Sequence, residues 1–133
     1  MKELGDEQHY VLSPTAAGLA RRRLDIFIDA IESSLLDDLR IITTELVANA
    51  VLHSGRAPGA PITVKNQLID DILRVDVIDY GHRVVILTAS DDATTGLGLV
   101  AAISDRWAGA GVTPFFVWAE LDVRTNGLVR RRT

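Results

Sequence analysis

The apolar residues of this 133-residue chain recur at intervals that change along the sequence, and each interval predicts an element of secondary structure. A short apolar run at residues 10–12 indicates a strand. Ser13 and Pro14 follow it, and both residue types are favoured where a helix begins. The next apolar residues keep a helical spacing, at Ala20, Leu24, Phe27 and Ile31. The chain is therefore predicted to begin with a strand and a helix.

A second helix is predicted from residue 35 to residue 53. Its apolar positions form one stripe that can face a core, at Leu35, Leu39, Ile42, Leu46 and Ala50. Ser54 and Gly55, followed by a stretch rich in proline and glycine at residues 58–61, end this helix and begin a loop.

Two strand patterns come next, at residues 62–69 and 72–79, and Asp70 and Asp71 join them into a hairpin. In the second pattern apolar and polar residues alternate, as expected of a strand with one buried face. A short apolar piece at residues 84–87 and a polar loop at residues 88–95 follow.

A third helix is predicted to open at Gly96, with Leu99, Ile103 and Trp107 on its buried stripe and with Gly109 and Gly111 ending it. The last predicted strand covers residues 115–123. The elements thus follow in the order β-α-α-β-β-(β)-α-β. This order predicts an α+β two-layer sandwich, with a mixed, mostly antiparallel sheet covered on one face by three helices. One domain of residues 1–133 is expected, with residues 1–8 and 124–133 as flexible ends.

Composition narrows the function classes. A hydrophobic fraction of 47% is ample for one core, and a net charge of −4 argues against a nucleic-acid binder. The absence of cysteine excludes disulfides, thiolate metal sites and a cysteine nucleophile. No apolar run is long enough to cross a bilayer, and no signal-peptide region stands at residues 1–7, so we expect a soluble, cytoplasmic protein without membrane contact.

Two groups of arginines are open to more than one interpretation. Arg21, Arg22 and Arg23 on the first helix form a solvated face or a protein-docking patch. The basic residues between Arg124 and Arg132 fit a solvated tail better than a binding arm.

The chemistry-bearing pattern lies on the second helix, where Glu45, Asn49 and His53 stand four residues apart. That spacing places an acid, an amide and an imidazole on one stripe, separate from the apolar stripe. Such an arrangement suits a magnesium–nucleotide site. Taken singly, each of these residues would be read as an ordinary solvated side chain.

Two further motifs follow in a specific order. Asp79-x-Gly81 ends a predicted strand, and Gly96-x-Gly98 opens a predicted helix. Alone, the first is a common turn and the second a helix entry with close packing. Together with the stripe, they resemble the N box and the two glycine boxes of the GHKL ATPase superfamily, which has the Bergerat ATP-binding fold. The small size and the Asp105-Arg106-Trp107 ending resemble its HATPase-type branch of bacterial anti-sigma factor serine kinases.

The resemblance implies a role for each site residue. Asn49 would coordinate Mg²⁺, and Glu45 would act as general base or orient the attacking hydroxyl. Asp79 would accept a hydrogen bond from the adenine amino group, while Gly81 would let the backbone approach the base. The backbone around the second glycine box would hold the phosphates, at Gly96, Leu97, Gly98 and Leu99. His53 has either a supporting role or a packing role.

The resemblance also implies a function. Such proteins bind ATP with Mg²⁺, hold a sigma factor inactive, and phosphorylate a serine of an anti-sigma factor antagonist. They commonly dimerise, so a homodimer is expected. Phe115 and Phe116 stand where relatives have a Gly-Lys-Thr-like segment, and the loop from Gly81 to Thr95 has no lysine.

These departures keep an alternative function open, a non-catalytic nucleotide-dependent protein-binding module. A separated sensor-kinase ATPase domain and an α+β domain that never binds nucleotide are further alternatives.

Overall fold

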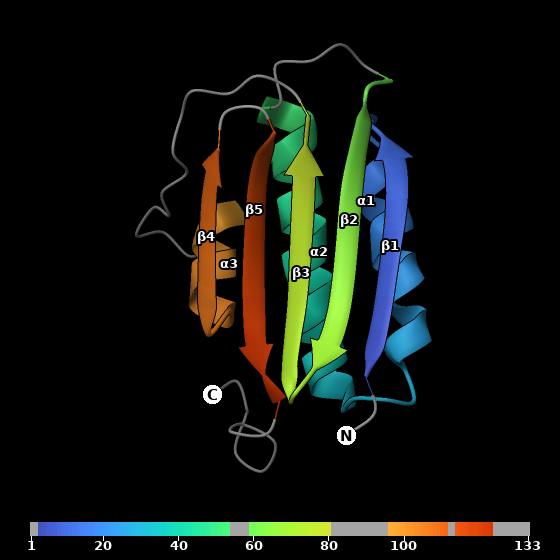
Figure 1. The fold of residues 1–133 in the computed structure, drawn as a ribbon, viewed down its shortest axis with the longest axis vertical. Helices are drawn as coiled ribbons and strands as arrows, with labels where there is room; N and C mark the ends of the chain where they lie inside the picture. The colour runs from blue at the N-terminus through green and yellow to red at the C-terminus, as the bar shows by residue number, and fades with distance from the viewer. Residues whose placement is uncertain (1–2, 54–58, 81–95, 112–113, 124–133) are drawn as a thin grey trace.

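The computed structural model of the chain describes residues 3–53, 59–80, 96–111 and 114–123 (Figure 1). In these parts the elements follow in the order β1 (Leu4–Val11), α1 (Ala16–Arg23), a 3-10 turn η1 (Leu24–Phe27), α2 (Ser33–His53), β2 (Pro61–Ile69), β3 (Ile72–Asp79), α3 (Gly96–Ile103), β4 (Arg106–Gly111) and β5 (Phe115–Asp122).

The five strands form one sheet in the order β1-β2-β3-β5-β4, and every described pairing is antiparallel. The predicted hairpin is confirmed as β2 and β3. Asp70 and Asp71 form its two-residue turn with φ angles of 50° and 65°. Left-handed residues at both positions match the right-handed twist of the flanking strands, and aspartate tolerates this conformation better than most residues.

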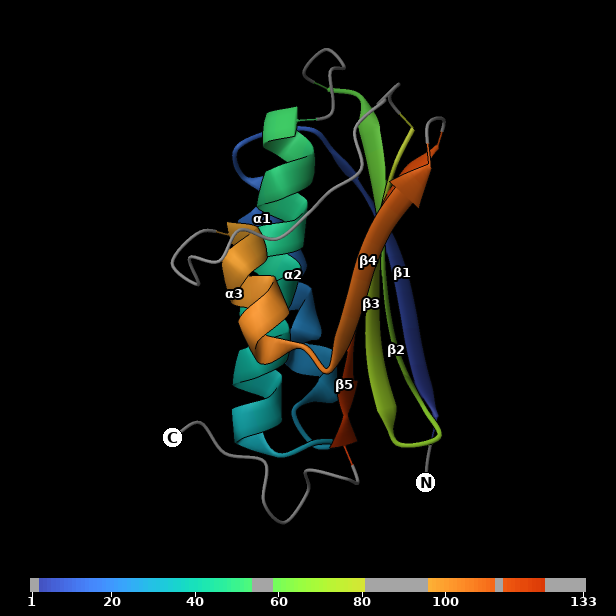
Figure 2. The same cartoon turned by 90° about the vertical axis from the view of Figure 1, so that its left-hand side faces the viewer.

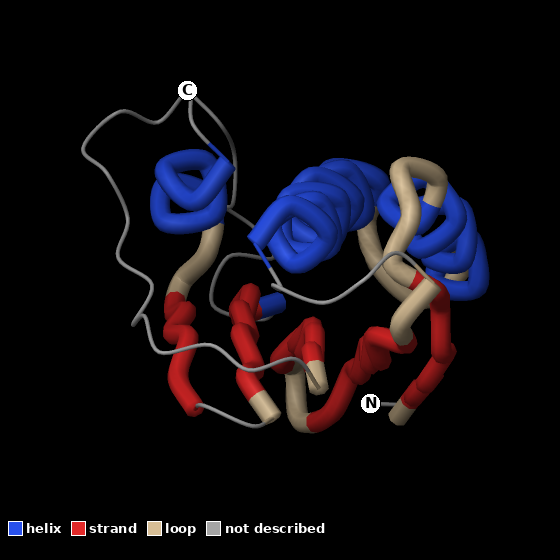
Figure 3. The backbone as a smooth tube through the Cα atoms, turned by 90° about the horizontal axis from the view of Figure 1, so that it is seen from above, coloured by secondary structure: helices blue, strands red, loops and turns tan. Residues whose placement is uncertain are grey.

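The three helices cover one face of the sheet, which confirms the predicted two-layer α+β class (Figures 2 and 3). Burial alternates along β3, where the side chains of Leu73, Val75, Val77 and Asp79 are buried on the helix-facing side. Strand β5 contributes Val117, Ala119 and Leu121 to the same core. The inner face of the sheet and the apolar faces of the helices therefore share one hydrophobic core.

Helix α2 crosses the centre of that core and packs against α1, α3, β3 and β5. Its 21 residues give it a length of about 32 Å. The predicted apolar stripe is confirmed, because Leu35, Leu39, Ile42, Leu46 and Ala50 are all at most 4% exposed. This burial fixes the rotation of the helix, so the residues of its other faces are held in defined directions.

The first strand and first helix differ from the sequence prediction. Strand β1 begins at Leu4, so residues 4–8, which we expected to belong to a flexible end, pair with β2 instead. Helix α1 begins at Ala16 with Thr15 as its N-cap residue, and no side chain caps it; the Ser13 hydroxyl lies 3.1 Å from the Thr15 hydroxyl. The helix also tightens into η1 after Arg23 and does not continue to Ile31.

The third helix is shorter than predicted. It begins at Gly96 as expected but ends at Ile103, and Trp107, Gly109 and Gly111 lie in strand β4. Trp107 pairs with Ala119 of β5. The helical spacing from Leu99 to Trp107 misled the prediction, because the chain turns at Ser104 and Asp105, where the N–H of Asp105 already donates to β5.

Three predicted segments lie outside the described residues: the apolar piece at 84–87, the polar loop at 88–95 and the basic end at 124–133. Within the described parts, no helix combines the length and apolar character needed to cross a membrane.

Candidate functional site

Helix α2 supplies the first wall of the candidate site. Glu45 and Asn49 lie one turn apart and are partly buried, while the neighbouring Leu46 and Ala50 are buried in the core. The core contacts therefore fix the direction in which the carboxylate and the amide project. His53 is the last residue of α2, but its side chain lies outside the described structure.

Strand β3 supplies a buried carboxylate at its carboxyl end. Asp79 is 2% exposed and takes the helix-facing position that follows Leu73, Val75 and Val77 along the strand. A carboxylate costs several kcal/mol to bury unless polar groups bind it, so a carboxylate at this position in an apolar row indicates a polar function. Gly81, which completes the predicted motif, lies outside the described residues.

Helix α3 supplies the third wall. It begins at Gly96, its residue Gly98 is buried, and Leu97 and Leu99 are half-buried. The first backbone N–H groups of any helix lack partners within the helix, so the start of α3 offers donors for an anion. Helix α3 packs against α2 and β4.

The three walls belong to elements that pack together. Helix α2 touches α3, β3 and β5, and the carboxyl ends of α2 and β3 lie at the same end of the molecule (Figures 1 and 2). An acid, an amide, a buried carboxylate and a helix start thus lie on α2 and on two elements that pack against it.

The two phenylalanines take different positions beside this site. Phe116 is 40% exposed and follows the outward-facing alternation of β5, so its ring lies on the sheet face away from the helices. Phe115 is the direct register partner of Asp79. The residue that replaces the expected small polar segment next to the buried carboxylate is therefore Phe115.

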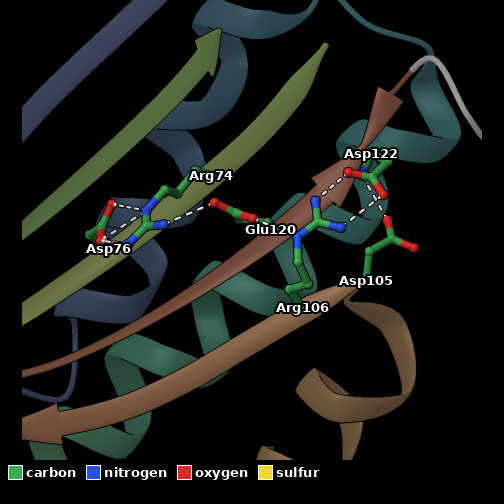
Figure 4. A network of polar contacts seen from close by, with 6 residues as sticks. All are labelled: Arg74, Asp76, Asp105, Arg106, Glu120 and Asp122. Atoms are coloured by element: carbon green, nitrogen blue, oxygen red, sulfur yellow. Dashed lines mark hydrogen bonds and ion pairs between the residues drawn. The ribbon is translucent and has the colours of Figure 1, made fainter. Parts of the chain in front are cut away.

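A network of charged residues on the outer face of the sheet was not predicted from sequence (Figure 4). Arg106 of β4 donates to Glu120 at 2.7 Å and also binds Asp122. Arg74 of β3 donates to the other oxygen of Glu120 at 2.9 Å and to Asp76 at 3.0 Å. These side chains join three adjacent strands. In the sequence, the only sign of this network is the alternation that places the charged residues of β3, β4 and β5 on the outer face.

The network also fixes the turn between α3 and β4. The backbone N–H of Asp105 donates to the carbonyl of Glu120 at 2.9 Å, and the Asp105 carboxylate accepts from the N–H of Asp122 at 2.7 Å. The guanidinium of Arg74 lies 4.4 Å from the centre of the Trp118 ring. Helix α3 ends at Ile103, two residues before Asp105. The hydrogen bonds of Asp105 therefore connect the end of the helix to β5.

The charges of the network shift the pKa values of its members. Burial raises the pKa of Glu120, but hydrogen bonds from Arg106 and Arg74 outweigh burial and leave that pKa below its ordinary value. The hydrogen bond to Asp122 and that to Glu120 raise the pKa of Arg106. Both groups therefore stay charged over the physiological pH range.

The arrangement defines a class of fold, a two-layer α+β protein with an antiparallel sheet and helices on one face. The same fold occurs in the crystal structure of the RsbU and RsbW domains of Rv1364c from Mycobacterium tuberculosis, with a TM-score of 0.62 and 18% sequence identity. The likeness covers 87% of this chain and 31% of that chain, so this chain spans about a third of that protein. No family model and no curated protein matches the sequence.

Proposed function

We propose that the chain binds ATP with Mg²⁺ at this site and acts as a serine-protein kinase of the anti-sigma factor type, a GHKL ATPase. The observation that carries the proposal is the buried carboxylate of Asp79 at the end of β3, on the same side of the sheet as Glu45 and Asn49. The shared fold with a protein that contains an RsbW domain supports it.

The residues present fit the nucleotide and its ion. Asp79 would accept a hydrogen bond from the adenine amino group, and Gly81 would allow the base to approach the backbone. The backbone N–H groups at the start of α3 would bind phosphate oxygens, at Gly96, Leu97, Gly98 and Leu99. The ligand thus spans from the end of β3 to the start of α3.

Asn49 and Glu45 would serve the phosphate end. The amide oxygen of Asn49 is a suitable ligand for Mg²⁺, which keeps most of its waters and takes its remaining ligands from phosphates. When bound, Mg²⁺ neutralises charge on the phosphates. Glu45 would accept the proton of the serine hydroxyl that is to be phosphorylated.

The partners follow from the same proposal. An anti-sigma factor kinase sequesters a sigma factor and phosphorylates an anti-sigma factor antagonist, and we propose both as protein partners of a cytoplasmic homodimer. Helix α1 presents Arg21, Arg22 and Arg23 outside the core, where a partner can reach them.

A second function is favoured by one observation, the pairing of Phe115 with Asp79. Phenylalanine stands at this register position in place of the small polar residue that the resemblance implies. This change fits a non-catalytic module that uses nucleotide to regulate protein binding. The two functions agree on nucleotide binding and differ on phosphoryl transfer.

Calorimetry with Mg²⁺ and ATP tests the shared part. We expect the Asp79→Asn variant to bind ATP at least about tenfold more weakly, because a neutral amide oxygen is a weaker acceptor for the adenine amino group than a carboxylate. Asp37→Asn makes the same chemical change at an exposed position of α2 that pairs with Arg40, and its affinity should stay within about twofold of the parent. Equal affinities in the two variants would contradict the proposed site.

Labelled ATP and a candidate antagonist then separate the two functions. Phosphoserine on the antagonist supports the kinase, whereas nucleotide binding without transfer supports the regulatory module.

A further inference from the structure

A groove lies at the edge of the molecule opposite to α3 and β4, between β1 and the α1–η1 segment. Its volume is about 440 Å³, and its walls include Gln8 and Tyr10 from β1 and Leu19, Arg22 and Ile26 from the helical side. Figures 1 and 3 show α1 running beside this strand. The groove is therefore separate from the proposed nucleotide site.

The helical wall of the groove has an apolar–basic–apolar order. Leu19 and Arg22 lie in α1 and Ile26 lies in η1, and all three line the groove. Leu19 is 45% exposed and Ile26 is 39% exposed, although both are large apolar residues. Two exposed apolar side chains around a cation form a surface that can recognise a complementary sequence.

The two arginines of this wall differ in their ion pairs. Arg23 donates to both oxygens of Asp6, at 2.8 and 3.1 Å, and this hydrogen bonding lowers the pKa of Asp6. In the described parts of the chain, no carboxylate is paired with Arg22. Asp25, which also lines the groove, is bound by Arg40 at 2.7 Å. Arg22 is thus the available positive charge of the groove.

Strand β1 leaves one edge open beside the groove, since no other described strand pairs with it there. The N–H of Leu12 donates to the carbonyl of Ala60 at 2.7 Å and its carbonyl accepts from the N–H of Gly59 at 3.0 Å, so position 12 is a hydrogen-bonded position beside β2. Such positions alternate in an antiparallel ladder, and Pro61, opposite Val11, has no N–H to offer. The backbone groups of Glu7 and His9 therefore point to the open edge.

We propose that this edge and groove bind an extended segment of another protein, which adds to the sheet as a strand beside β1. The segment carries apolar, acidic and apolar residues at alternate positions. Its backbone pairs with the outward groups of Glu7 and His9, and its acidic side chain meets Arg22 between Leu19 and Ile26.

The dimensions and the charge agree with this occupant. Leu19 and Ile26 are separated by roughly 11 Å along the helix axis. Alternate positions i and i+4 of a strand span roughly 13 Å. The β1 strand of a second copy fits less well, because its corresponding residues are Leu4, Asp6 and Gln8, and Asp6 is already bound by Arg23. The proposal goes beyond nucleotide binding, and its test needs no nucleotide.

Fluorescence anisotropy with a labelled peptide whose central residues are valine, threonine, aspartate, threonine and leucine tests the proposal. We expect saturable binding to the parent protein and at least about tenfold weaker binding to Arg22→Glu. Arg21→Glu is the matched control, because Arg21 is exposed on the same helix but does not line the groove; its affinity should change less than about twofold. A peptide with lysine in place of aspartate should prefer Arg22→Glu to the parent.

The backbone part of the proposal has its own variant. Glu7→Pro removes an N–H that points to the open edge and spares the pairing with β2, so peptide binding should be lost while the circular dichroism spectrum is kept. Absence of peptide binding to the parent, or equal loss in the Arg21 and Arg22 variants, would overturn the proposal. So would a parent dimer that Glu7→Pro dissociates, since a second copy would then occupy this edge.

Discussion

Charged residues are arranged differently on the two faces of the sheet. On the outer face, Arg74 and Arg106 bind the carboxylates around them, and the network joins three strands. On the inner face, Asp79 stands at the end of an otherwise apolar row. Charges that bind one another stabilise structure and have little capacity left for a ligand. Asp79 takes a position in the row that an apolar side chain could fill, so we expect a ligand to bind on the inner face.

The largest expected effect concerns Glu45, on the inner side. Glu45→Ala should lower phosphoryl transfer by about 10²–10⁴-fold, because the proposed proton acceptor is lost, while ATP affinity stays within about twofold. Transfer of labelled phosphate to an antagonist and calorimetry measure the two quantities. Glu32→Gln, at an exposed position just before α2, is the control and should leave both unchanged. Phosphoryl transfer by Glu45→Ala at the rate of the parent would contradict the role of Glu45 as proton acceptor.

A smaller effect is expected on the free energy of unfolding, when side chains on the two faces of strand β3 are shortened. Leu73 of β3 is 1% exposed and faces the helices, whereas the neighbouring Ile72 is half-buried on the opposite face. We expect Leu73→Ala to lower the free energy of unfolding by about 2–5 kcal/mol and Ile72→Ala by clearly less. Urea denaturation measures both. Equal losses would show that the outer face is buried by a further contact.

The smallest effect concerns the outer network and depends on pH. The pKa of Glu120 in the folded chain is below its ordinary value of 4.5, so its ion pairs stabilise the fold above that pH. This stabilisation is lost as the pH falls through the lowered pKa. The difference in unfolding free energy between the parent and Glu120→Gln should therefore be at most about 1 kcal/mol near pH 7 and vanish in acid. A difference that grows on acidification would contradict this pairing.

Much of the fold could be predicted because its strongest patterns are local. The stripe of α2 repeats over about four turns, and the alternation of β2 and β3 flanks a turn of two aspartates. Strand β4 was not predicted, because Trp107, Gly109 and Gly111 form a strand through their pairing with β5, which the local sequence pattern does not reveal. The length of strand β1 was predicted too short, because its charged residues, such as Asp6, form ion pairs with residues distant in the sequence.

The candidate site could be predicted only as a set of residues. The sequence places Glu45 and Asn49 one turn apart, and the structure gives that face a fixed direction by burying Leu46 and Ala50. That Asp79 is buried could be expected from the alternation of β3. The ion pairs that fix the α3–β4 turn could not, because they depend on the order of the strands.

The strand order also determines when the site can form during synthesis. Strand β5 is the last described strand in sequence, yet it lies between β3 and β4 in the sheet. A nascent chain that has emerged only as far as Gly111 can close the β2–β3 hairpin but gives β4 no neighbour. Strand β4 can join the sheet only after residues 115–122 have left the ribosome, because β5 is its pairing partner. Completion of this half of the sheet, and of the α3–β4 turn that binds β5, therefore waits for the last described strand.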